Sequence, residues 1–368
     1  MKVLITGANG FIGKNLVVYL GERGWTDITT FVRGEPVDAL TAKVAHADFI
    51  FHLAGINRPK SDTGFFEGNV DLTRALCAAV ESSRRKIPLA YASSIQVDRD
   101  NAYGSSKRMA EDTLHQMTAS TGSPTYIYRL PNVFGKWCRP NYNSAVATFC
   151  CNISRGLPIE IHEPNVVIDL VYIDDLVADF ERLLSSPPQD SEYRHVEPRY
   201  QISVGNLVEQ LRAFKAGRTS LEVGPVGNGL TRALYSTYIS YYSPEQFAYP
   251  LIKHEDARGI FVEVLKTRDF GQFSYFTAHP GVTRGGHYHH SKTEKFLVLK
   301  GDALFRYRNI QTGETYEYRT DGAVPEVVET IPGWAHDITN IGQHELVVMV
   351  WANEVFDPQR PDTVAHKV

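Results

Sequence analysis

The first two thirds of the chain alternate short apolar runs with amphipathic stretches. Apolar runs bounded by turn residues predict buried strands at residues 2–6, 28–32, 48–53, 89–92 and 125–129. Apolar positions spaced three and four apart predict helices between them, over residues 11–22, about 69–82 and about 103–121. This order of strands and helices predicts an α/β domain built on a doubly wound parallel sheet with right-handed crossovers.

The pattern changes near residue 245, where short β-rich runs separated by glycine and proline turns replace the helical periods. These runs predict strands at residues 261–266, 273–278, 295–299, 304–308, 315–318 and 346–352. Closely spaced short strands without long helices are typical of a sandwich or barrel. The aromatic and proline-containing segment 236–250 lies at the change. We therefore predict two domains, residues 1–244 and 245–368, of which the second is all-β.

The composition narrows the class of protein. A chain of 368 residues with 43% apolar residues is long enough for two packed cores. Its net charge of -4 and the absence of a long basic run argue against nucleic acid or an anionic membrane surface as partners. It shows no signal peptide and no long apolar span, so we expect a soluble, cytoplasmic protein. The four cysteines lack CxxC spacing, which indicates reduced thiols.

A glycine-rich turn follows the first predicted strand and opens the first predicted helix. Its sequence is GANGFIG, residues 7–13. Glycine permits a sharp turn and a close approach of backbone to a pyrophosphate, and the helix N-terminus presents free N–H groups to the phosphates. A purely structural turn is the alternative, but the strand-to-helix context favours a dinucleotide site. We expect the cofactor to contact this turn at Gly7, Asn9, Gly10, Phe11, Ile12 and Gly13.

A second motif, NAYGSSK, places Tyr103 and Lys107 on one face of a predicted helix. An ammonium group one turn from a phenol favours the phenolate, so the tyrosine can exchange a proton with a carbonyl or alcohol at neutral pH. Upstream, Ser93 and Ser94 end a predicted parallel strand, where the active sites of open α/β sheets lie. A solvated Tyr–Lys pair is the alternative. Its combination with the glycine turn and the strand-end serines favours catalysis.

These elements resemble the extended short-chain dehydrogenases/reductases, a family of nucleotide-sugar epimerases, dehydratases and reductases, over residues 1 to about 240. The resemblance implies a Rossmann-like fold. It also implies that the catalytic residues are Ser94, Tyr103 and Lys107. Ser94 is preferred to Ser93 because it is the last serine before the IQV segment.

The same resemblance outlines the cofactor pocket. It implies that Leu53 and Ala54 of the HLAG segment line the cofactor together with the catalytic tyrosine and lysine, and that Asn132 of PNVFG borders the nicotinamide and the sugar. At the end of the second strand stands Arg33, which would attract a 2′-phosphate, where NAD sites place an acidic residue. We therefore expect NADPH, although Glu35 is close enough in sequence to bind a ribose instead.

Two departures from the family pattern stand out. The segment from Arg33 to His52 is too short for the strand and helix that the family places there, so we expect this edge of the sheet to be abbreviated. In VVIDLVYIDD, Ile168 occupies the position of the family's diphosphate-binding arginine. Lys136 and Arg139 are candidates to replace that arginine in a UDP-sugar site, and ordinary surface charges are the alternative.

The segment GGHYHHSKTE in the second domain has the spacing of a metal site. His287 and His289 alternate, so on a strand both rings point to the same face, and Glu294 can return to it. His336 of PGWAH supplies a further imidazole. Three imidazoles and a carboxylate suit a borderline divalent metal, with Zn²⁺ first and Mn, Fe or Ni as alternatives. His290 faces the other side of an ideal strand and is not expected to be a ligand.

These two segments resemble the motifs of the cupins, small β-barrels with a metal or sugar site inside, although Pro332 and Gly333 are adjacent rather than one residue apart. Together the domains resemble, over nearly the whole chain, the bifunctional capsular-polysaccharide enzymes of the CapF family and their O-antigen counterparts. That resemblance implies a homodimer acting on a UDP-sugar. The cupin domain would epimerise C3 of a UDP-2-acetamido-2,6-dideoxy-4-hexulose. The reductase domain would then reduce its C4 ketone with NADPH to UDP-2-acetamido-2,6-dideoxy-L-talose, on the route to UDP-N-acetyl-L-fucosamine.

Two other interpretations stay open at this point. In the first, the protein is a nucleotide-sugar reductase whose cupin is only a structural or dimerisation module. In the second, it is a regulatory protein that senses NADPH. A sensor would not need the serine, tyrosine and lysine of a reductase, so their presence argues against the second interpretation.

Overall fold

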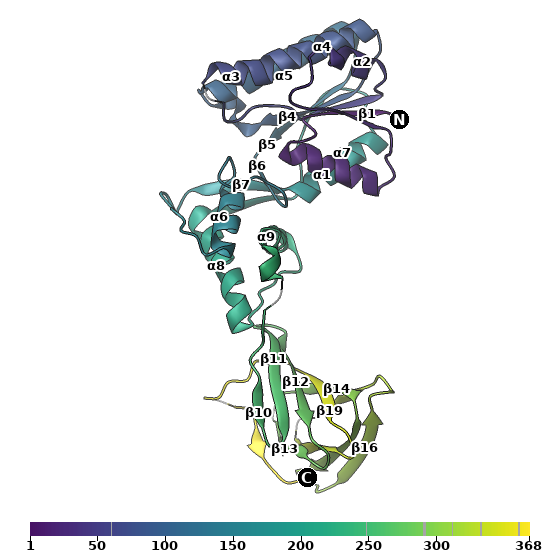
Figure 1. The fold of residues 1–368 in the computed structure, drawn as a ribbon, viewed down its shortest axis with the longest axis vertical. Helices are drawn as coiled ribbons and strands as arrows, with labels where there is room; N and C mark the ends of the chain where they lie inside the picture. The colour runs from purple at the N-terminus through teal and green to yellow at the C-terminus, as the bar shows by residue number, and fades with distance from the viewer. Residues whose placement is uncertain (60, 248, 290–291, 311, 332, 360) are drawn as a thin grey trace. The chain divides into compact units, whose positions relative to one another are not determined.

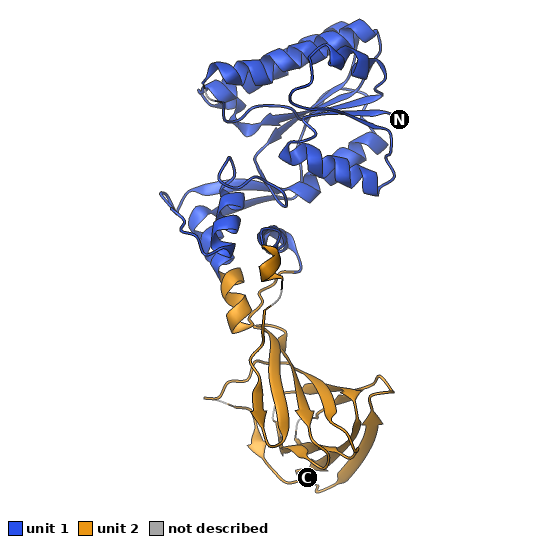
Figure 2. Ribbon diagram, viewed as in Figure 1, with its two compact units in different colours: residues 1–212, 227–242 blue, residues 213–226, 243–368 orange. Residues whose placement is uncertain are grey.

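The computed structural model describes the chain except for residues 60, 248, 290–291, 311, 332 and 360. It consists of two compact units, residues 1–212 with 227–242 and residues 213–226 with 243–368 (Figure 2). The short segment belongs with the second unit because Leu221 and Val223 exchange backbone hydrogen bonds with Lys266. The predicted division into domains 1–244 and 245–368 concerns which segments fold independently, and it stays a prediction.

The first unit is built on a six-stranded sheet with the order β2-β1-β3-β4-β5-β8. All neighbouring strands in it are parallel. The predicted doubly wound α/β fold is confirmed. The strands are β1 (Val3–Thr6), β2 (Ile28–Phe31), β3 (Phe49–His52), β4 (Leu89–Ser94), β5 (Thr125–Leu130) and β8 (Glu192–Arg194).

Helices cover both faces of this sheet, which is why its strands read as continuous apolar runs. Figure 1 shows α1 (Phe11–Glu22) and α7 (Ile173–Ser185) on one face. The opposite face carries α2 (Ala39–Ala45), α4 (Leu72–Ser83) and α5 (Ala102–Thr121). Between the sheet and these three helices, the core includes Leu4, Ile50, Val80 and Leu114. The short α3 (Thr63–Phe65) and η1 (Phe66–Asp71) precede α4, and η2 (Ile95–Asp98) precedes α5.

The edge of the sheet at β2 is abbreviated, as expected. Doubly wound sheets commonly place a further strand outside the second one. Here β2 is the edge strand, and a single helix of seven residues, α2, leads from it to β3.

A second, smaller sheet extends the first unit, in a region where the sequence pattern predicted no element. Its three strands lie in the order β6-β7-β9. They are β6 (Asn132–Phe134), β7 (Val167–Tyr172) and β9 (Arg199–Ser203). The helices that accompany it are α6 (Ala145–Ser154), α9 (Gly229–Ile239) and the first part of α8 (Val204–Ser220), whose residues 213–220 belong to the second unit. None of the helices in the described part of the chain is both long and apolar enough to cross a membrane.

The second unit consists of two antiparallel sheets that enclose an apolar core, a β cupin-like fold. One sheet has the order β10-β11-β12-β19-β14-β17 and the other β16-β15-β18-β13-β20. Phe276, Phe296 and Val348 of the first sheet meet Phe305 and Ile338 of the second in this core. The predicted all-β barrel is confirmed.

The strands of the first sheet are β10 (His254–Asp256), β11 (Gly259–Thr267), β12 (Gly271–Ala278), β14 (Glu294–Lys300), β17 (Val327–Glu329) and β19 (Leu346–Ala352). Those of the second are β13 (Thr283–Tyr288), β15 (Asp302–Asn309), β16 (Thr315–Asp321), β18 (Trp334–Asn340) and β20 (Val364–Ala365). The sequence pattern did not predict β13 or β18, although both carry candidate metal ligands. A short 3-10 turn, η3 (Pro244–Gln246), precedes β10.

Candidate functional site

The glycine turn between β1 and α1 is a place of close backbone approach. Gly7 has a φ of +71°, which favours glycine, and a Cβ there would lie 2.6 Å from the amide nitrogen of Ala54. A Cβ on Gly13 would lie 2.3 Å from the carbonyl oxygen of Gly7. Gly7 and Gly13 therefore cannot take a side chain without a shift of the backbone. Leu53 and Ala54, predicted to line the cofactor, lie directly beside this turn.

The start of α1 is suited to bind an anion. Its N-cap is Gly10, and no side chain caps the first turn or places an acidic group in it. The first amide groups of a helix have no partner within the helix, and they favour a phosphate. The other residues predicted to contact the cofactor surround this end of the helix, with Asn9 exposed and Phe11 and Ile12 half-buried. Their contact with a dinucleotide stays a prediction.

Arg33 and Glu35 follow β2 and differ in their surroundings. The Arg33 side chain is exposed and makes no hydrogen bond or ion pair with another residue that the structure describes. The Glu35 carboxylate pairs with Lys43 and accepts the backbone N–H of Val32 at 2.8 Å. The hydrogen bond from Lys43 lowers the pKa of Glu35. Of these two residues, the arginine is the one that is free to meet a ligand.

Ser94 and Tyr103 are brought together by β4 and α5. Ser94 is the last residue of β4 and its hydroxyl accepts the backbone N–H of Gln96 at 3.2 Å. Asn101 caps α5 by accepting the N–H of Gly104 at 2.8 Å, which places Tyr103 in the first turn. Burial raises the pKa of Tyr103, and a hydrogen bond with Ser94 acts in the opposite direction. The phenol is therefore protonated at neutral pH and can act as a proton donor.

Lys107 lies one turn further along α5 and is buried. Its Nζ donates to the carbonyl oxygen of Ala92 at 2.9 Å and to the hydroxyl of Tyr91 at 3.2 Å. Burial lowers the pKa of Lys107 to about 8, while Glu111 acts in the opposite direction. The ammonium form thus predominates at neutral pH, and Lys107 loses its proton at a pH only slightly above neutral. In the sequence, Tyr91 is marked only by one polar atom in an apolar strand.

The neighbouring serine has a different partner. Ser93 donates a hydrogen bond to Glu111, which is itself buried. The same carboxylate binds the Arg129 guanidinium at 2.7 Å. Ser93 therefore belongs to a hydrogen-bond network with Glu111 and Arg129, whereas Ser94 contacts the phenol of Tyr103. This difference agrees with the choice of Ser94, whose catalytic role stays a prediction.

The residues predicted for the UDP-sugar lie at β6 and just after it. Asn132 donates to the carbonyl oxygen of Asp169 at 3.1 Å. Lys136 pairs with Asp174, so part of its charge is neutralised. Arg139 is exposed, with its guanidinium 5.2 Å from the centre of the Tyr142 ring. Whether these side chains bind a diphosphate stays a prediction.

Arg232 of α9 is a further cation that the sequence analysis did not identify. Its guanidinium lies 5.9 Å from the centre of the Tyr172 ring, at the end of β7. Tyr172 ends the strand on which Ile168 lies, so this arginine is a third candidate for the missing diphosphate ligand, after Lys136 and Arg139. It comes from a helix far along the chain, which a motif near β7 could not reveal.

The second unit brings the four predicted metal ligands together. One possible ligand atom from each of them lies within 4.8 Å of the others. They are His287, His289, Glu294 and His336. A β-bulge between Gly285 and His287 adjusts the register of β13, and it places His287 directly opposite His336 on β18. Strand β13 ends one residue before His289, and His290 lies outside the described residues.

Two of the three imidazole rings are oriented as metal ligands usually are. The Nδ1 of His289 donates to the carbonyl oxygen of Asp362, which leaves Nε2 facing Glu294 Oε2 at 3.3 Å. The Nε2 of His336 is 3.5 Å from the same oxygen and, among the described residues, has no hydrogen-bond partner. A buried nitrogen without a partner is costly unless an ion binds it. The donor set and this orphaned atom fit a divalent cation.

The surroundings of the cluster set the protonation states of Glu294 and His287. Burial alone would raise the pKa of Glu294, but His289 and His336 hold it well below its ordinary value, and Lys292 adds to this effect. The Lys292 Nζ lies 2.9 Å from Glu294 Oε1, a contact that the sequence analysis did not foresee. Burial lowers the pKa of His287 to about 4, and the neighbouring imidazoles act in the same direction. At neutral pH the site therefore offers a carboxylate and a neutral His287.

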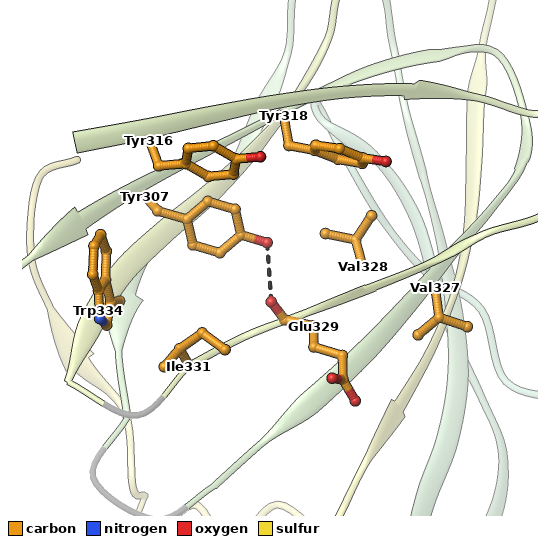
Figure 3. A pocket seen from close by; sticks show the side chains of 8 residues that line it. All are labelled: Tyr307, Tyr316, Tyr318, Val327, Val328, Glu329, Ile331 and Trp334. Carbon is orange, nitrogen blue, oxygen red and sulfur yellow. Dashed lines mark hydrogen bonds between the residues drawn. The ribbon is translucent and has the colours of Figure 1, made fainter.

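The second unit also contains an aromatic pocket of about 390 Å³ (Figure 3). Tyr307, whose hydroxyl donates to the Glu329 carbonyl at 3.1 Å, lies directly opposite His336 in the strand register. The carbonyl oxygen of Trp334 lies 3.4 Å from Nδ1 of His336. Strand β18 therefore contributes both a pocket residue, Trp334, and a candidate ligand, His336. The pocket is lined by Tyr307, Tyr316, Tyr318, Val327, Val328, Glu329, Ile331 and Trp334.

The four cysteines show no sign of catalytic or metal-binding reactivity. All four are buried free thiols. Burial raises the pKa of Cys77 to about 12, with Glu81 acting in the same direction. A thiol with such a pKa stays protonated and unreactive at neutral pH.

Comparisons with known proteins agree with this division into two units. Residues 3–197 match the NAD dependent epimerase/dehydratase family, and residues 254–364 match the polysaccharide biosynthesis C-terminal domain. A Pseudomonas aeruginosa protein named UDP-2-acetamido-2,6-beta-L-arabino-hexul-4-ose reductase is 58% identical over 368 residues, covering 100% of this chain and 99% of that protein.

One solved structure matches the whole chain and another matches part of it. The capsular polysaccharide assembling protein CapF from Staphylococcus aureus superposes with a TM-score of 0.91, at 40% identity and with 100% of both chains covered. A UDP-glucuronic acid 4-epimerase from Bacillus cereus in complex with NAD reaches a TM-score of 0.52 at 20% identity, covering 59% of this chain and 84% of that chain. The last similarity shows a shared fold alone.

Proposed function

The chain belongs to the NAD dependent epimerase/dehydratase family and joins that domain to a CapF-type cupin, and from this premise we propose a bifunctional nucleotide-sugar enzyme. Its second domain epimerises C3 of a UDP-2-acetamido-2,6-dideoxy-4-hexulose, and its first domain reduces the C4 ketone. The product is UDP-2-acetamido-2,6-dideoxy-L-talose, on the route to UDP-N-acetyl-L-fucosamine for capsule or O-antigen. The similarity over the full length to a hexulose reductase carries this proposal.

The reduction uses the residues at the end of β4 and the start of α5. NADPH bound along the glycine turn would supply a hydride to C4 of the ketosugar. Tyr103 donates its phenolic proton to the C4 oxygen, which converts the ketone to an alcohol. Ser94 hydrogen-bonds the ketone oxygen and the phenol, and the Lys107 ammonium stabilises the phenolate left on Tyr103. The raised pKa of Tyr103 supports its role as the acid.

We assign NADPH rather than NADH to the cofactor site. The exposed Arg33 can meet a 2′-phosphate with a charge-assisted hydrogen bond. Glu35 is held by Lys43 and by the Val32 amide, so it is not free to accept from a ribose hydroxyl. Both observations support preference for the phosphorylated cofactor.

The epimerisation uses the cluster of three histidines and Glu294. A divalent cation held there, Zn²⁺ first, would act as a Lewis acid that stabilises the negative charge developing beside the ketone. One C3–H bond breaks and another forms on the opposite face, so no oxidant or reductant is needed. The aromatic pocket beside His336 offers apolar faces for the hexulose ring and its methyl groups.

The two reactions have a required order. A proton next to a ketone is acidic, and one next to the corresponding alcohol is not, so C3 must be epimerised before C4 is reduced. One ketone therefore serves both domains in turn. The homodimer implied by the CapF resemblance is part of this proposal, and light scattering on the purified protein tests it.

The test is to incubate the full-length protein with the 4-keto sugar in deuterated water, with and without NADPH. We expect deuterium at C3 without NADPH, and consumption of NADPH with formation of the L-talose derivative when it is added. If the cupin were only a structural or dimerisation module, C3 would stay unlabelled while NADPH was still oxidised.

A further inference from the structure

The ammonium group of Lys107 is held by a second tyrosine, Tyr91, in the middle of β4. The Nζ of Lys107 donates to the Tyr91 hydroxyl at 3.2 Å and to the carbonyl oxygen of Ala92 at 2.9 Å. Both side chains are buried, with 1% of Tyr91 and 6% of Lys107 exposed. Two of the three N–H groups of the ammonium are thereby occupied within the protein.

Tyr91 is itself fixed by its surroundings. Its ring stacks on the imidazole of His52, with the ring centres 5.3 Å apart and an interplanar angle of 25°. Both ring nitrogens of His52 form hydrogen bonds, Nδ1 with the hydroxyl of Thr6 at 2.8 Å and Nε2 with the hydroxyl of Thr73 at 2.9 Å. Tyr91 also belongs to the core between the sheet and the helices. The phenol oxygen is therefore a fixed point rather than a mobile ligand.

A lysine side chain loses much rotational freedom when it is held in one position, and catalysis depends on that position. Two of its N–H groups donate to fixed acceptors, and these two hydrogen bonds restrain the position of the ammonium. Its third N–H is then left for one further acceptor, which in the proposed function is the cofactor ribose. A Cβ built on Gly55 would lie 3.4 Å from the Lys107 Nζ, so the backbone after β3 also approaches this ammonium closely.

We propose that Tyr91 is a positioning residue for reduction, whose hydroxyl and the adjacent Ala92 carbonyl hold the Lys107 ammonium in its working place. This inference rests on the proposed function, because it assigns a role to Tyr91 through Lys107. Tyr91 acts through the lysine and does not itself donate the proton to the sugar.

The charged and titratable groups around Lys107 define the expected effect of removing this hydroxyl. Glu111 on the same helix favours the ammonium, whereas burial disfavours it. On β3, His52 is neutral because burial lowers its pKa to about 3. Burial keeps both phenols, Tyr91 and Tyr103, protonated at neutral pH. Loss of the Tyr91 oxygen removes an acceptor from the charged form, so Lys107 would lose its proton at a lower pH.

The test compares Tyr91→Phe with wild type across pH, in the full-length protein, by following NADPH oxidation with the ketosugar. We expect kcat at neutral pH to fall about tenfold, and the loss of activity at high pH to begin about one pH unit lower. Tyr126→Phe is the matched control, since this buried tyrosine of the neighbouring strand β5 donates to the Pro188 carbonyl instead. Its pH profile should match wild type.

A profile of Tyr91→Phe that differs from wild type only by a constant factor, or not at all, would overturn the inference. Should this variant fail to fold, Tyr91→Met provides the same comparison without a phenol. Tyr103→Phe separates the inference from its premise. If that variant still oxidises NADPH, the proposed catalytic set is wrong. If it is inactive while Tyr91→Phe keeps the wild-type profile, only the role of Tyr91 is rejected.

Discussion

His287 and His336 lie directly opposite each other on neighbouring antiparallel strands, with ring centres 4.8 Å apart and nearly perpendicular planes at 81°. Each comes from a different sequence segment, and the bulge at Gly285 sets the register that joins them. The candidate metal site is therefore a product of strand pairing rather than of one local motif. Changes to its ligands should affect the second domain's chemistry and leave the reductase residues intact.

Tyr103→Phe should abolish NADPH oxidation and leave deuterium exchange at C3 unchanged. The variant lacks the proposed proton donor for the C4 oxygen, and the second unit contains none of the altered atoms. The measurement is cofactor absorbance in parallel with mass spectrometry of the sugar. NADPH consumption near the wild-type rate would reject Tyr103 as the acid.

Arg33→Asp should weaken the binding of NADPH far more than that of NADH, by about 1–3 kcal/mol if a charge-assisted contact to the 2′-phosphate is lost. Lys43→Met is an informative companion, because it releases Glu35 and should improve NADH binding. Titration calorimetry with both cofactors measures the difference. Equal losses for the two cofactors in the arginine variant would exclude the phosphate role.

Gly13→Ala should weaken NADPH binding and lower the melting temperature, because the new Cβ would lie 2.3 Å from the Gly7 carbonyl oxygen. The forced shift is of the kind that costs about 1–3 kcal/mol. Gly21→Ala is the matched control on the same helix, since a Cβ there meets no atom within 4 Å. Unchanged affinity in Gly13→Ala would show that the turn does not shape the cofactor site.

The rate of reduction should fall as pH rises through about 8, because the neutral form of Lys107 no longer stabilises a phenolate on Tyr103. The sign follows from burial, which lowers the pKa of Lys107 to about 8 and so brings its deprotonation into this range. A pH profile of kcat with saturating NADPH tests this. A rate that stays constant to well above pH 9 would contradict the assignment.

Trp334→Ala should raise KM for C3 exchange while metal content stays stoichiometric, because the indole lines the pocket and is not a ligand. Trp351→Ala serves as the control, since that indole donates to the Phe270 carbonyl outside the pocket. Exchange kinetics at several sugar concentrations distinguish the two variants. Similar small effects in both would remove the pocket from the proposed substrate site.

The sequence predicts regular elements well where they have a strong local period. The first helix begins at Phe11 and ends at Glu22 as predicted, and β19 spans the predicted residues 346–352. Strands β13 and β18 were missed because glycines, histidines and aspartate interrupt their apolar alternation. Their pairing depends on neighbours far along the chain, which a period cannot reveal.

The candidate sites likewise could be predicted where they depend on local sequence and not where they depend on distant segments. The serine, tyrosine and lysine of the reductase lie at spacings that a motif captures. The contact between Tyr91 and Lys107 and the placement of the arginine of α9 beside Tyr172 arise from tertiary packing. The aromatic pocket similarly needs side chains from four strands, β15, β16, β17 and β18. Such features leave no spacing in the sequence from which they could have been predicted.

The central claim, that the second domain catalyses epimerisation at a bound metal, is tested most directly by His289→Ala. In deuterated water without NADPH, wild type and the exposed-histidine control His344→Ala should label C3. His289→Ala should hold well under one metal per chain by elemental analysis and leave C3 unlabelled. It should still oxidise NADPH with a substrate that already has the epimerised C3. Full metal content, or undiminished labelling after the metal is lost, would contradict the account.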